Sequence, residues 1–107
     1  GVISATSDIT QKHITGEFTR GLEALDGWSP ILFEWTSESG MQDGLTYAGF
    51  GAQHVKPHIP EAVFGEEGKY TVMDRPILMV AVNAIKQLKA SLDQLSKEFA
   101  DYKSTHP

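Results

Sequence analysis

The last third of the chain carries an apolar seam whose residues are spaced alternately three and four positions apart. This spacing is the a/d pattern of a coiled coil, and it is kept over roughly three and a half heptads. A helix with one such seam buries it against other helices, and a chain of 107 residues has few of its own to offer. We therefore expect the chain to assemble with copies of itself. The seam consists of Leu78, Ala81, Ile85, Leu88, Leu92, Leu95, Phe99 and Tyr102.

Composition limits the other possibilities. The length fits a single domain with a modest core, and the formal net charge of -5 predicts no general affinity for nucleic acid or for an anionic membrane. The chain has no cysteine, which excludes a disulfide framework and a thiolate zinc site. No apolar run approaches the roughly 20 residues that span a bilayer. The first residues, GVISATSD, lack an initiator Met and the pattern of a signal peptide, so we expect a fragment of a longer protein.

A first helix is predicted from Thr15 to Asp26. Phe18, Leu22 and Leu25 would share one face of it, and Gly27 is a suitable stop. The residues before Thr15 show no clear period and are expected to be extended or irregular.

Four short strands are predicted in the middle of the chain, where β-branched and aromatic residues gather. Two prolines hold residues 53–60 to about one helical turn. A polar loop, residues 37–44, links the first two strands, and a link with two glycines makes the last two a hairpin. The predicted strands are residues 31–36, 45–52, 62–64 and 69–72.

A long final helix should begin near Asp74, as its N-cap, with Pro76 in the first turn, and run to about Tyr102, a length of about 40 Å. From Ile77 to Ile85 it is apolar nearly all round, which predicts burial on several sides, under the strands. From Lys86 onward only the seam is apolar, so this half should project as a coiled coil. The alternative is an amphipathic helix packed on its own domain. The heptads alone do not choose between a dimer and a trimer.

The fold class expected is therefore α+β: a small mixed domain with short strands and a hairpin, followed by a long C-terminal helix that forms a coiled coil. Few residues of the chain are candidates for catalysis. Ser7 and Lys12 lie five residues apart, and a serine becomes a nucleophile when a base such as a lysine with a lowered pKa takes its proton. On spacing alone this is very weak evidence, and a solvated serine and lysine near a terminus are the favoured explanation.

Other polar residues give no stronger signal. His54 and His58 are four apart but have no third ligand at metal-binding spacing, so surface or core-edge histidines are favoured, with no metal and no cofactor. Glu34 is expected on the solvent face of its strand rather than as a buried acid. Arg75 either covers apolar surface with its stem or pairs with an acid such as Asp74.

Three stretches, in order, resemble the peptidase S74 domain, the intramolecular chaperone at the C-terminus of phage endosialidases, tailspikes, tail fibres and neck appendage proteins. Ser7-Asp8 with Lys12 and Ile14 resembles its opening, typically Ser-Asp-x-Arg-x-Lys-x-x-Ile. The middle of the family resembles ILFEW at residues 31–35, AGFGAQ at 48–53 and PEAV at 60–63, and the start of its final helix resembles YTVMDRPILMVAVNAIKQL at 70–88.

This resemblance implies a homotrimer that helps the upstream β-rich stalk of the same polypeptide to fold and then cuts itself off once, as a serine endopeptidase with a Ser-Lys dyad. Ser7 would be the nucleophile, Lys12 its base, and Asp8 a support of the local geometry. Three further residues occupy positions near family residues linked to the site or to coupling: Gln53, His54 and Arg75. Residues 1–6 would end the stalk or linker, residues 7–75 form the chaperone and cleavage region, and residues 76–107 form the coiled-coil helix and tail.

The resemblance also implies a place of action: the host cytoplasm during virion assembly, with the parent protein in the virion tail or appendage. Thr10 and Gln11 depart from the family pattern, which has Arg and Leu at these positions. Two alternatives therefore stand beside the self-cleaving chaperone. One is a trimerisation tip that stays attached to its fibre, and the other is a receptor-binding module that presents the loop at residues 37–44.

Overall fold

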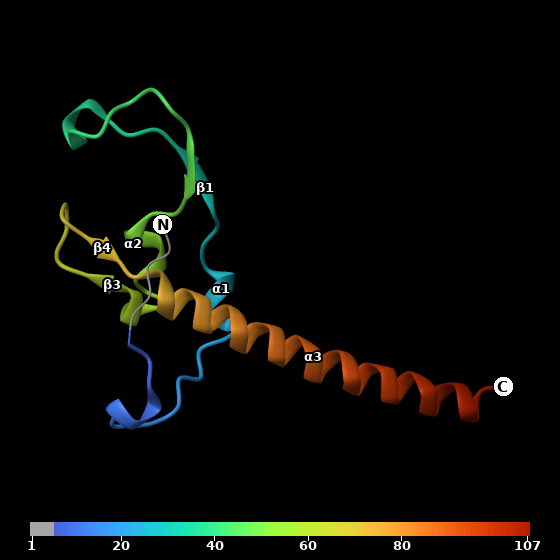
Figure 1. Ribbon diagram of the computed structural model, residues 1–107. Coiled ribbons are helices and arrows are strands. Elements are labelled where there is room, and N and C mark those ends of the chain that lie inside the picture. Colours follow the sequence, from blue (N-terminus) through green and yellow to red (C-terminus); the bar gives the residue numbers. More distant parts are fainter. Residues whose placement is uncertain (1–5) are drawn as a thin grey trace.

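The computed structural model describes residues 6–107, in which a small mixed region is followed by one long helix (Figure 1). Most of the expected upstream segment, residues 1–6, lies outside the described residues. The shape is extended: the radius of gyration is 19.8 Å, against about 13 Å for a compact domain of this size. The helices are α1 (Glu23–Asp26), α2 (Ala52–Val55) and α3 (Asp74–Thr105), the strands β1 (Ile31–Phe33), β2 (Tyr47–Gly49), β3 (Val63–Phe64) and β4 (Thr71–Val72), and the 3-10 turns η1 (Ile9–Gln11), η2 (Ser37–Ser39) and η3 (Pro60–Ala62).

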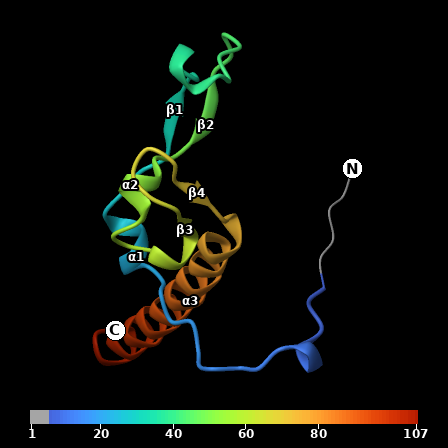
Figure 2. The same cartoon turned by 90° about the vertical axis from the view of Figure 1, so that its left-hand side faces the viewer.

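β1 and β2 form an antiparallel pair that projects from the body as an arm (Figures 1 and 2). Phe33 pairs with Tyr47, and the rings of Phe33, Trp35 and Tyr47 cluster beside the ladder. Both strands are shorter than the sequence predicted, because a 3-10 turn follows β1 at Ser37 and Ala52 already begins a helix.

The second antiparallel pair, β3 and β4, is the hairpin that the sequence predicted. Val63 pairs with Val72, and Phe64 pairs with Thr71. Gly65 and Gly68 in the link have φ values of 91° and 85°. Glycine adopts this left-handed region without steric penalty, which explains why two glycines lie here.

The core is small and lies where α2, η3 and α3 meet. Val55, Ile59, Ala62 and Val80 are fully buried, and Ala24 of α1 packs against them. Val80 is the contribution of α3, so the long helix is part of the core only through its first turns.

The predicted helix from Thr15 to Asp26 is wrong, because only α1 is helical there. Residues 18–22, which include Leu22 as the N-cap of α1, instead run along α3 without forming a helix of their own, and we call them the strap. Its backbone groups bond to side chains of α3 rather than to one another, as described below. The helical spacing of Phe18, Leu22 and Leu25 was misleading because Gly16 and Gly21 weaken helix formation.

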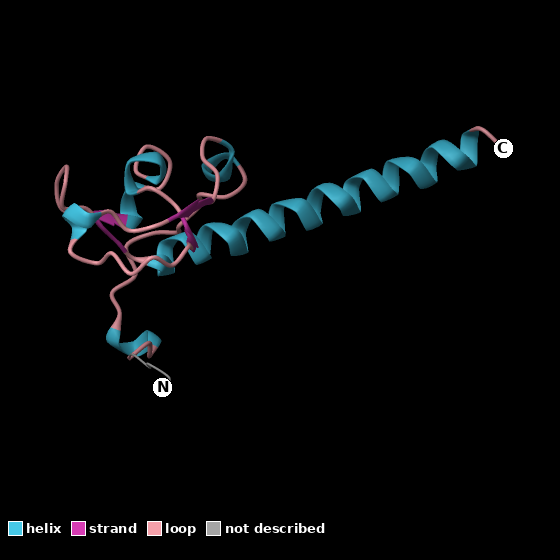
Figure 3. Ribbon diagram, turned by 90° about the horizontal axis from the view of Figure 1, so that it is seen from above, coloured by secondary structure: helices cyan, strands magenta, loops and turns pink. Residues whose placement is uncertain are grey.

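α3 extends from Asp74 to Thr105, which confirms the predicted long helix and carries it past Tyr102. Asp74 is its first residue rather than its cap; Met73 occupies that position. Burial of its first half is one-sided: Val80 is buried, whereas Leu78 is 53% exposed. From Ile85 to the end every residue is exposed, and the helix projects away from the body (Figure 3). In the part of the chain described, no helix is both long and apolar enough to cross a membrane.

Candidate active site and assembly surface

The turn η1 brings Ser7 and Lys12 together. Lys12 Nζ donates a hydrogen bond to Ser7 Oγ over 3.0 Å. Asp8 is the N-cap of the turn and accepts from the backbone N–H of Thr10 at 2.9 Å, and the Lys12 N–H closes the turn on the Ile9 carbonyl at 3.1 Å. A capped single turn therefore explains how a spacing of five residues becomes a direct contact.

Thr10, which departs from the family pattern, takes part in this turn. Its hydroxyl donates to Asp8 Oδ1 over 2.7 Å. The hydroxyl and then the amide of Thr10 lower the pKa of Asp8 below its ordinary value, so the cap stays ionised. Thr10 thus strengthens the turn that joins Ser7 to Lys12.

The pair lies in water in the single chain. Ser7 and Lys12 are both exposed, and the blue turn that carries them lies apart from the body of the fold (Figures 1 and 2). A lysine acts as a base where its surroundings remove its proton, and burial is the usual means. The geometry for proton transfer is present here, while the desolvation that would drive it is not.

Gln53, His54 and Arg75 lie elsewhere in the fold. Gln53 Nε2 donates to Glu67 Oε1 at 3.2 Å, the His54 ring packs near Gly51, and Arg75 lines a shallow hollow beside Phe18 at the start of α3. Among the described residues, none of the three is hydrogen-bonded to Ser7 or Lys12. The structure therefore does not bring these residues to the pair within one chain.

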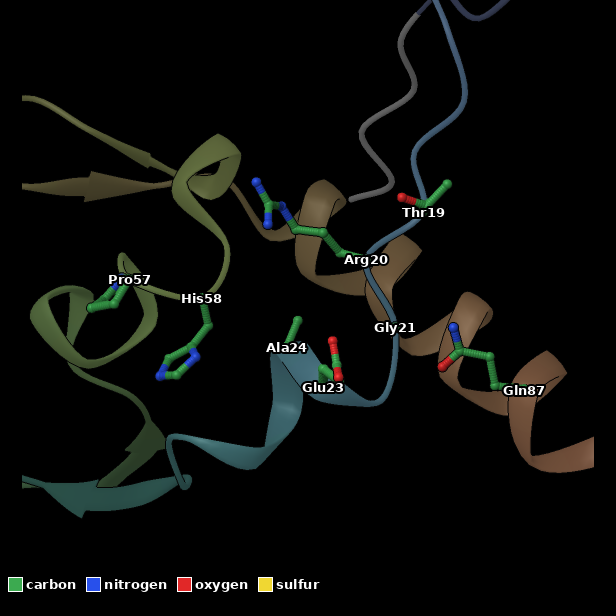
Figure 4. A pocket seen from close by; sticks show the side chains of 8 residues that line it. All are labelled: Thr19, Arg20, Gly21, Glu23, Ala24, Pro57, His58 and Gln87. Carbon is green, nitrogen blue, oxygen red and sulfur yellow. The ribbon is translucent and has the colours of Figure 1, made fainter. Parts of the chain in front are cut away.

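His54 and His58 lie in different parts of the fold, near Gly51 and Gly27 respectively. His58 lies against Gly27 and lines a hollow of about 430 Å³ beside the strap (Figure 4). Over residues 6–107, no group of three or more His, Cys, Asp or Glu residues lies together in a way that could hold a metal ion.

The strap is held by residues that the sequence analysis did not single out. Asn83 Nδ2 donates to the carbonyls of Phe18 and Arg20, at 2.8 and 2.9 Å. Gln87 Oε1 accepts from the Leu22 N–H at 2.8 Å. Asn83 and Gln87 lie four apart on one face of the helix, and Asn83 interrupts the apolar run from Ile77 to Ile85; this was the signal available in the sequence.

An ion pair completes the attachment of the strap. The Arg20 guanidinium donates to both carboxylate oxygens of Glu61 in η3, at 2.7 and 2.8 Å. This contact raises the pKa of Arg20 and lowers that of Glu61. Because both side chains are about two-fifths exposed, the pair orients the strap more than it stabilises the fold.

The seam of α3 is uncovered. Ile85 is 66% exposed and Leu92 62% exposed, and the remaining large members are open to a similar degree. In water a projecting helix of this length is marginally stable by itself, since most helical stability in proteins comes from packing of an apolar face. The exposed seam is therefore a candidate assembly surface. Its exposed large residues are Leu78, Ile85, Leu88, Leu92, Leu95, Phe99 and Tyr102.

Comparison with known protein families shows to which family the chain belongs. Residues 7–64 match the family model Peptidase_S74, described as chaperone of endosialidase. The matched segment is more than half of the chain, begins at Ser7 and ends in β3, so this protein belongs to the peptidase S74 chaperone-of-endosialidase family. The helix α3 lies beyond the matched segment. The comparison with curated proteins found no match.

Proposed function

We propose that this chain is the C-terminal intramolecular chaperone of a phage tail or appendage protein. Three copies associate through α3, assist the folding of the β-stalk that precedes them, and are released by self-cleavage between Thr6 and Ser7. Family membership supports the class of activity. The observation that carries the residue assignment is the 3.0 Å contact between Lys12 Nζ and Ser7 Oγ.

In the proposed reaction, Lys12 is neutral in the assembled trimer and accepts the hydroxyl proton of Ser7. Ser7 Oγ attacks the carbonyl carbon of Thr6, the C–N bond breaks, and the proton passes from Lys12 to the Ser7 nitrogen. The resulting ester between Thr6 and Ser7 Oγ is hydrolysed by water. The upstream chain leaves with a new carboxylate, and the hydroxyl of Ser7 is restored.

Assembly explains both halves of this function. A coiled coil of three α3 helices raises the local concentration of stalk chains and reduces the entropic cost of winding them in register. The exposed Ser7–Lys12 pair requires a neighbouring surface to desolvate it, and a partner chain supplies one. Cleavage then follows assembly, and the released stalk is kinetically trapped because its chaperone can no longer take part in unfolding.

The deciding experiment uses the chain extended upstream by its stalk. Ser7→Ala should abolish release, as seen on a gel, and leave the trimer intact, as measured by native mass. Ser29→Ala, at an exposed serine far along the chain, is the matched control and should cleave normally. Normal cleavage in Ser7→Ala would overturn the assignment.

A second candidate is a trimerisation tip that stays attached to its fibre. It is favoured by the replacement of the family's Arg and Leu by Thr10 and Gln11 and by the exposure of the Ser7–Lys12 pair. Intact mass analysis of the same extended chain separates the two, because the tip would keep its full mass after assembly.

A third candidate is a receptor-binding module. The arm formed by β1 and β2 presents an exposed loop, residues 37–44, at the end farthest from the core (Figure 1). Binding of the isolated domain to host cells, lost on deletion of that loop, would support it.

A further inference from the structure

The strap is attached to α3 by polar contacts rather than by burial. Three of its backbone groups bond to Asn83 and Gln87, whereas its residues 18–20 are exposed. A segment with little buried apolar surface has little else to hold it in place. Together with the partly exposed Arg20–Glu61 ion pair, these two side chains therefore decide where the strap lies.

Gly21 shows that the fit to Gln87 is close. A Cβ atom at Gly21 would lie 2.4 Å from Gln87 Oε1, and this glycine is buried. Because the obstacle is the end of a flexible side chain, an alanine here would push the Gln87 amide aside and break its bond to Leu22. A Cβ atom at Gly16, by contrast, meets nothing within 4 Å.

The strap-binding face and the seam occupy the same turns of α3. Val80, Asn83, Ala84 and Gln87 follow the i, i+3, i+4, i+7 spacing of one helical face. Leu78, Ile85 and Leu88 belong to the uncovered face. Association through the seam stabilises the turns that present Asn83 and Gln87.

We propose that Asn83 and Gln87 are positioning residues for self-cleavage, which tie the segment bearing Ser7 and Lys12 to the assembled coiled coil. This inference rests on the proposed function. Phe18 lies six positions after Lys12, a reach of about 20 Å at roughly 3.4 Å per residue. If the whole strap detaches, including the partly exposed Arg20–Glu61 pair, the next fixed point is Ala24 in the core, and the reach doubles to about 40 Å.

This difference sets the expected size of the effect. Doubling the reach enlarges the volume that the pair explores about eightfold, which lowers its effective concentration at the partner surface by the same factor. Loss of the strap should therefore slow cleavage about tenfold without preventing assembly. Neither Asn83 nor Gln87 touches the reacting atoms, so neither is a catalytic residue.

The first experiment tests strap attachment without any cleavage. In the full chain carrying Ser7→Ala, hydrogen exchange of the Leu22 amide is measured by NMR. Gln87→Met keeps the shape but removes the oxygen acceptor and should speed exchange; Gln87→Glu keeps an acceptor and should restore protection. Gln94→Ala, on an exposed turn beyond the body, is the control and should leave Leu22 unchanged.

The second experiment measures the rate of self-cleavage in the stalk-extended chain, with native mass as a check on assembly. Asn83→Asp cannot donate to the two carbonyls, and Gln87→Met cannot accept from the Leu22 amide. Because each single change leaves the other contact in place, the double variant should slow cleavage about tenfold and each single variant by less. Gln87→Glu should restore the rate, a rescue that a purely structural role would not require. If the helix variants fail to assemble, Gly21→Ala breaks the Gln87 contact from the side of the strap. Gly16→Ala, at a glycine with open space around it, is its control.

The outcomes separate the two proposals. A wild-type chain that stays uncut, or Ser7→Ala that cuts, defeats the proposed function while the exchange experiment still reports on the strap. Cleavage at the wild-type rate in trimers of the Asn83→Asp, Gln87→Met double variant, in which Leu22 exchanges fast, would overturn the positioning role alone. Slow cleavage with intact trimers, restored by Gln87→Glu, would support it.

Discussion

At the scale of single residues, the contact between Ser7 and Lys12 shows how little structure is needed to bring a serine hydroxyl against a lysine amine. One 3-10 turn capped by Asp8 closes the gap. The turn does not exclude water, so the pair has the distance for catalysis without the environment for it. In this proposal chemistry depends on a partner surface, which is a useful property for a reaction that should follow assembly.

Lys12→Ala tests the base directly. Since general-base catalysis contributes about 100-fold or more, release should slow by at least that factor while the native mass is unchanged. The measurement is the rate of appearance of the shortened chain. Lys97→Ala, an exposed lysine on α3 outside the seam, is the control. A rate retained within about tenfold would argue against Lys12 as the base.

The pair of Arg20 and Glu61 predicts a pH dependence for the strap. The hydrogen bond from Arg20 lowers the pKa of Glu61, so this contact stabilises the attached strap above the ordinary carboxyl pKa and is lost as pH falls through the lowered value. In Arg20→Gln the pKa of Glu61 should rise toward its ordinary value. Carboxyl ¹³C titration by NMR measures it.

The control for that titration is Lys69→Gln, which removes an exposed positive charge from the hairpin β3–β4. It should leave the Glu61 midpoint where it is in the wild type. Equal midpoints in Arg20→Gln and Lys69→Gln would contradict the role of Arg20. Since the pair is partly exposed, its contribution to stability should stay below about 1 kcal/mol.

At the scale of elements, sequence patterns succeeded where hydrophobic periodicity or glycine determined the structure by itself. The seam predicted α3, and Gly65 with Gly68 predicted the hairpin β3–β4. Periodicity failed at the strap, because the partners of its backbone lie more than sixty residues away on α3. Propensity does not report contacts of that range, so Asn83 and Gln87 were overlooked as well.

The candidate site residues show the same difference between local and long-range contacts. The Ser7–Lys12 contact is local, and the resemblance to the opening motif of the family, rather than the spacing alone, pointed to it. Gln53, His54 and Arg75 were carried over from the family, and within one chain they lie away from the pair. Whether a partner brings them closer depends on the assembly, which no pattern within a single chain encodes.

Leu92→Ala tests the seam as an element. Leu92 is exposed in the single chain, so the fold of residues 6–76 should be unaffected. In a coiled coil the same change removes a buried leucine from every chain, at about 2–5 kcal/mol each. The proposed trimer should therefore dissociate at concentrations where that of the wild type is intact, as measured by analytical ultracentrifugation. Unchanged masses for Leu92→Ala across all concentrations would contradict the assembly surface; Lys97→Ala serves as the control.

At the scale of the whole molecule, the extended shape divides stability into two parts. The small core around Val55, Ile59 and Val80 is complete within one chain, whereas α3 beyond Gln87 has no contact with the body that covers it. Folding of the body and ordering of the projecting helix should therefore respond to different conditions. Only the second should depend on protein concentration.

Dilution of the wild type tests this division. Helical circular dichroism at 222 nm should fall together with the native mass, because the projecting half of α3 is marginal alone. The near-ultraviolet signal of Trp28, which packs on the core, should persist through the same dilution. Full helicity in single chains would contradict the division, as would loss of both signals together.

The two faces of α3 between Leu78 and Leu88 also limit which substitutions the protein tolerates. One face meets the core and the strap, the other carries the seam, and few positions on these turns are left free for any residue. Beyond Leu88 only every third or fourth position is constrained. A comprehensive substitution scan should therefore find tolerance rising sharply near this point, so that the helix accumulates change mainly in its projecting half.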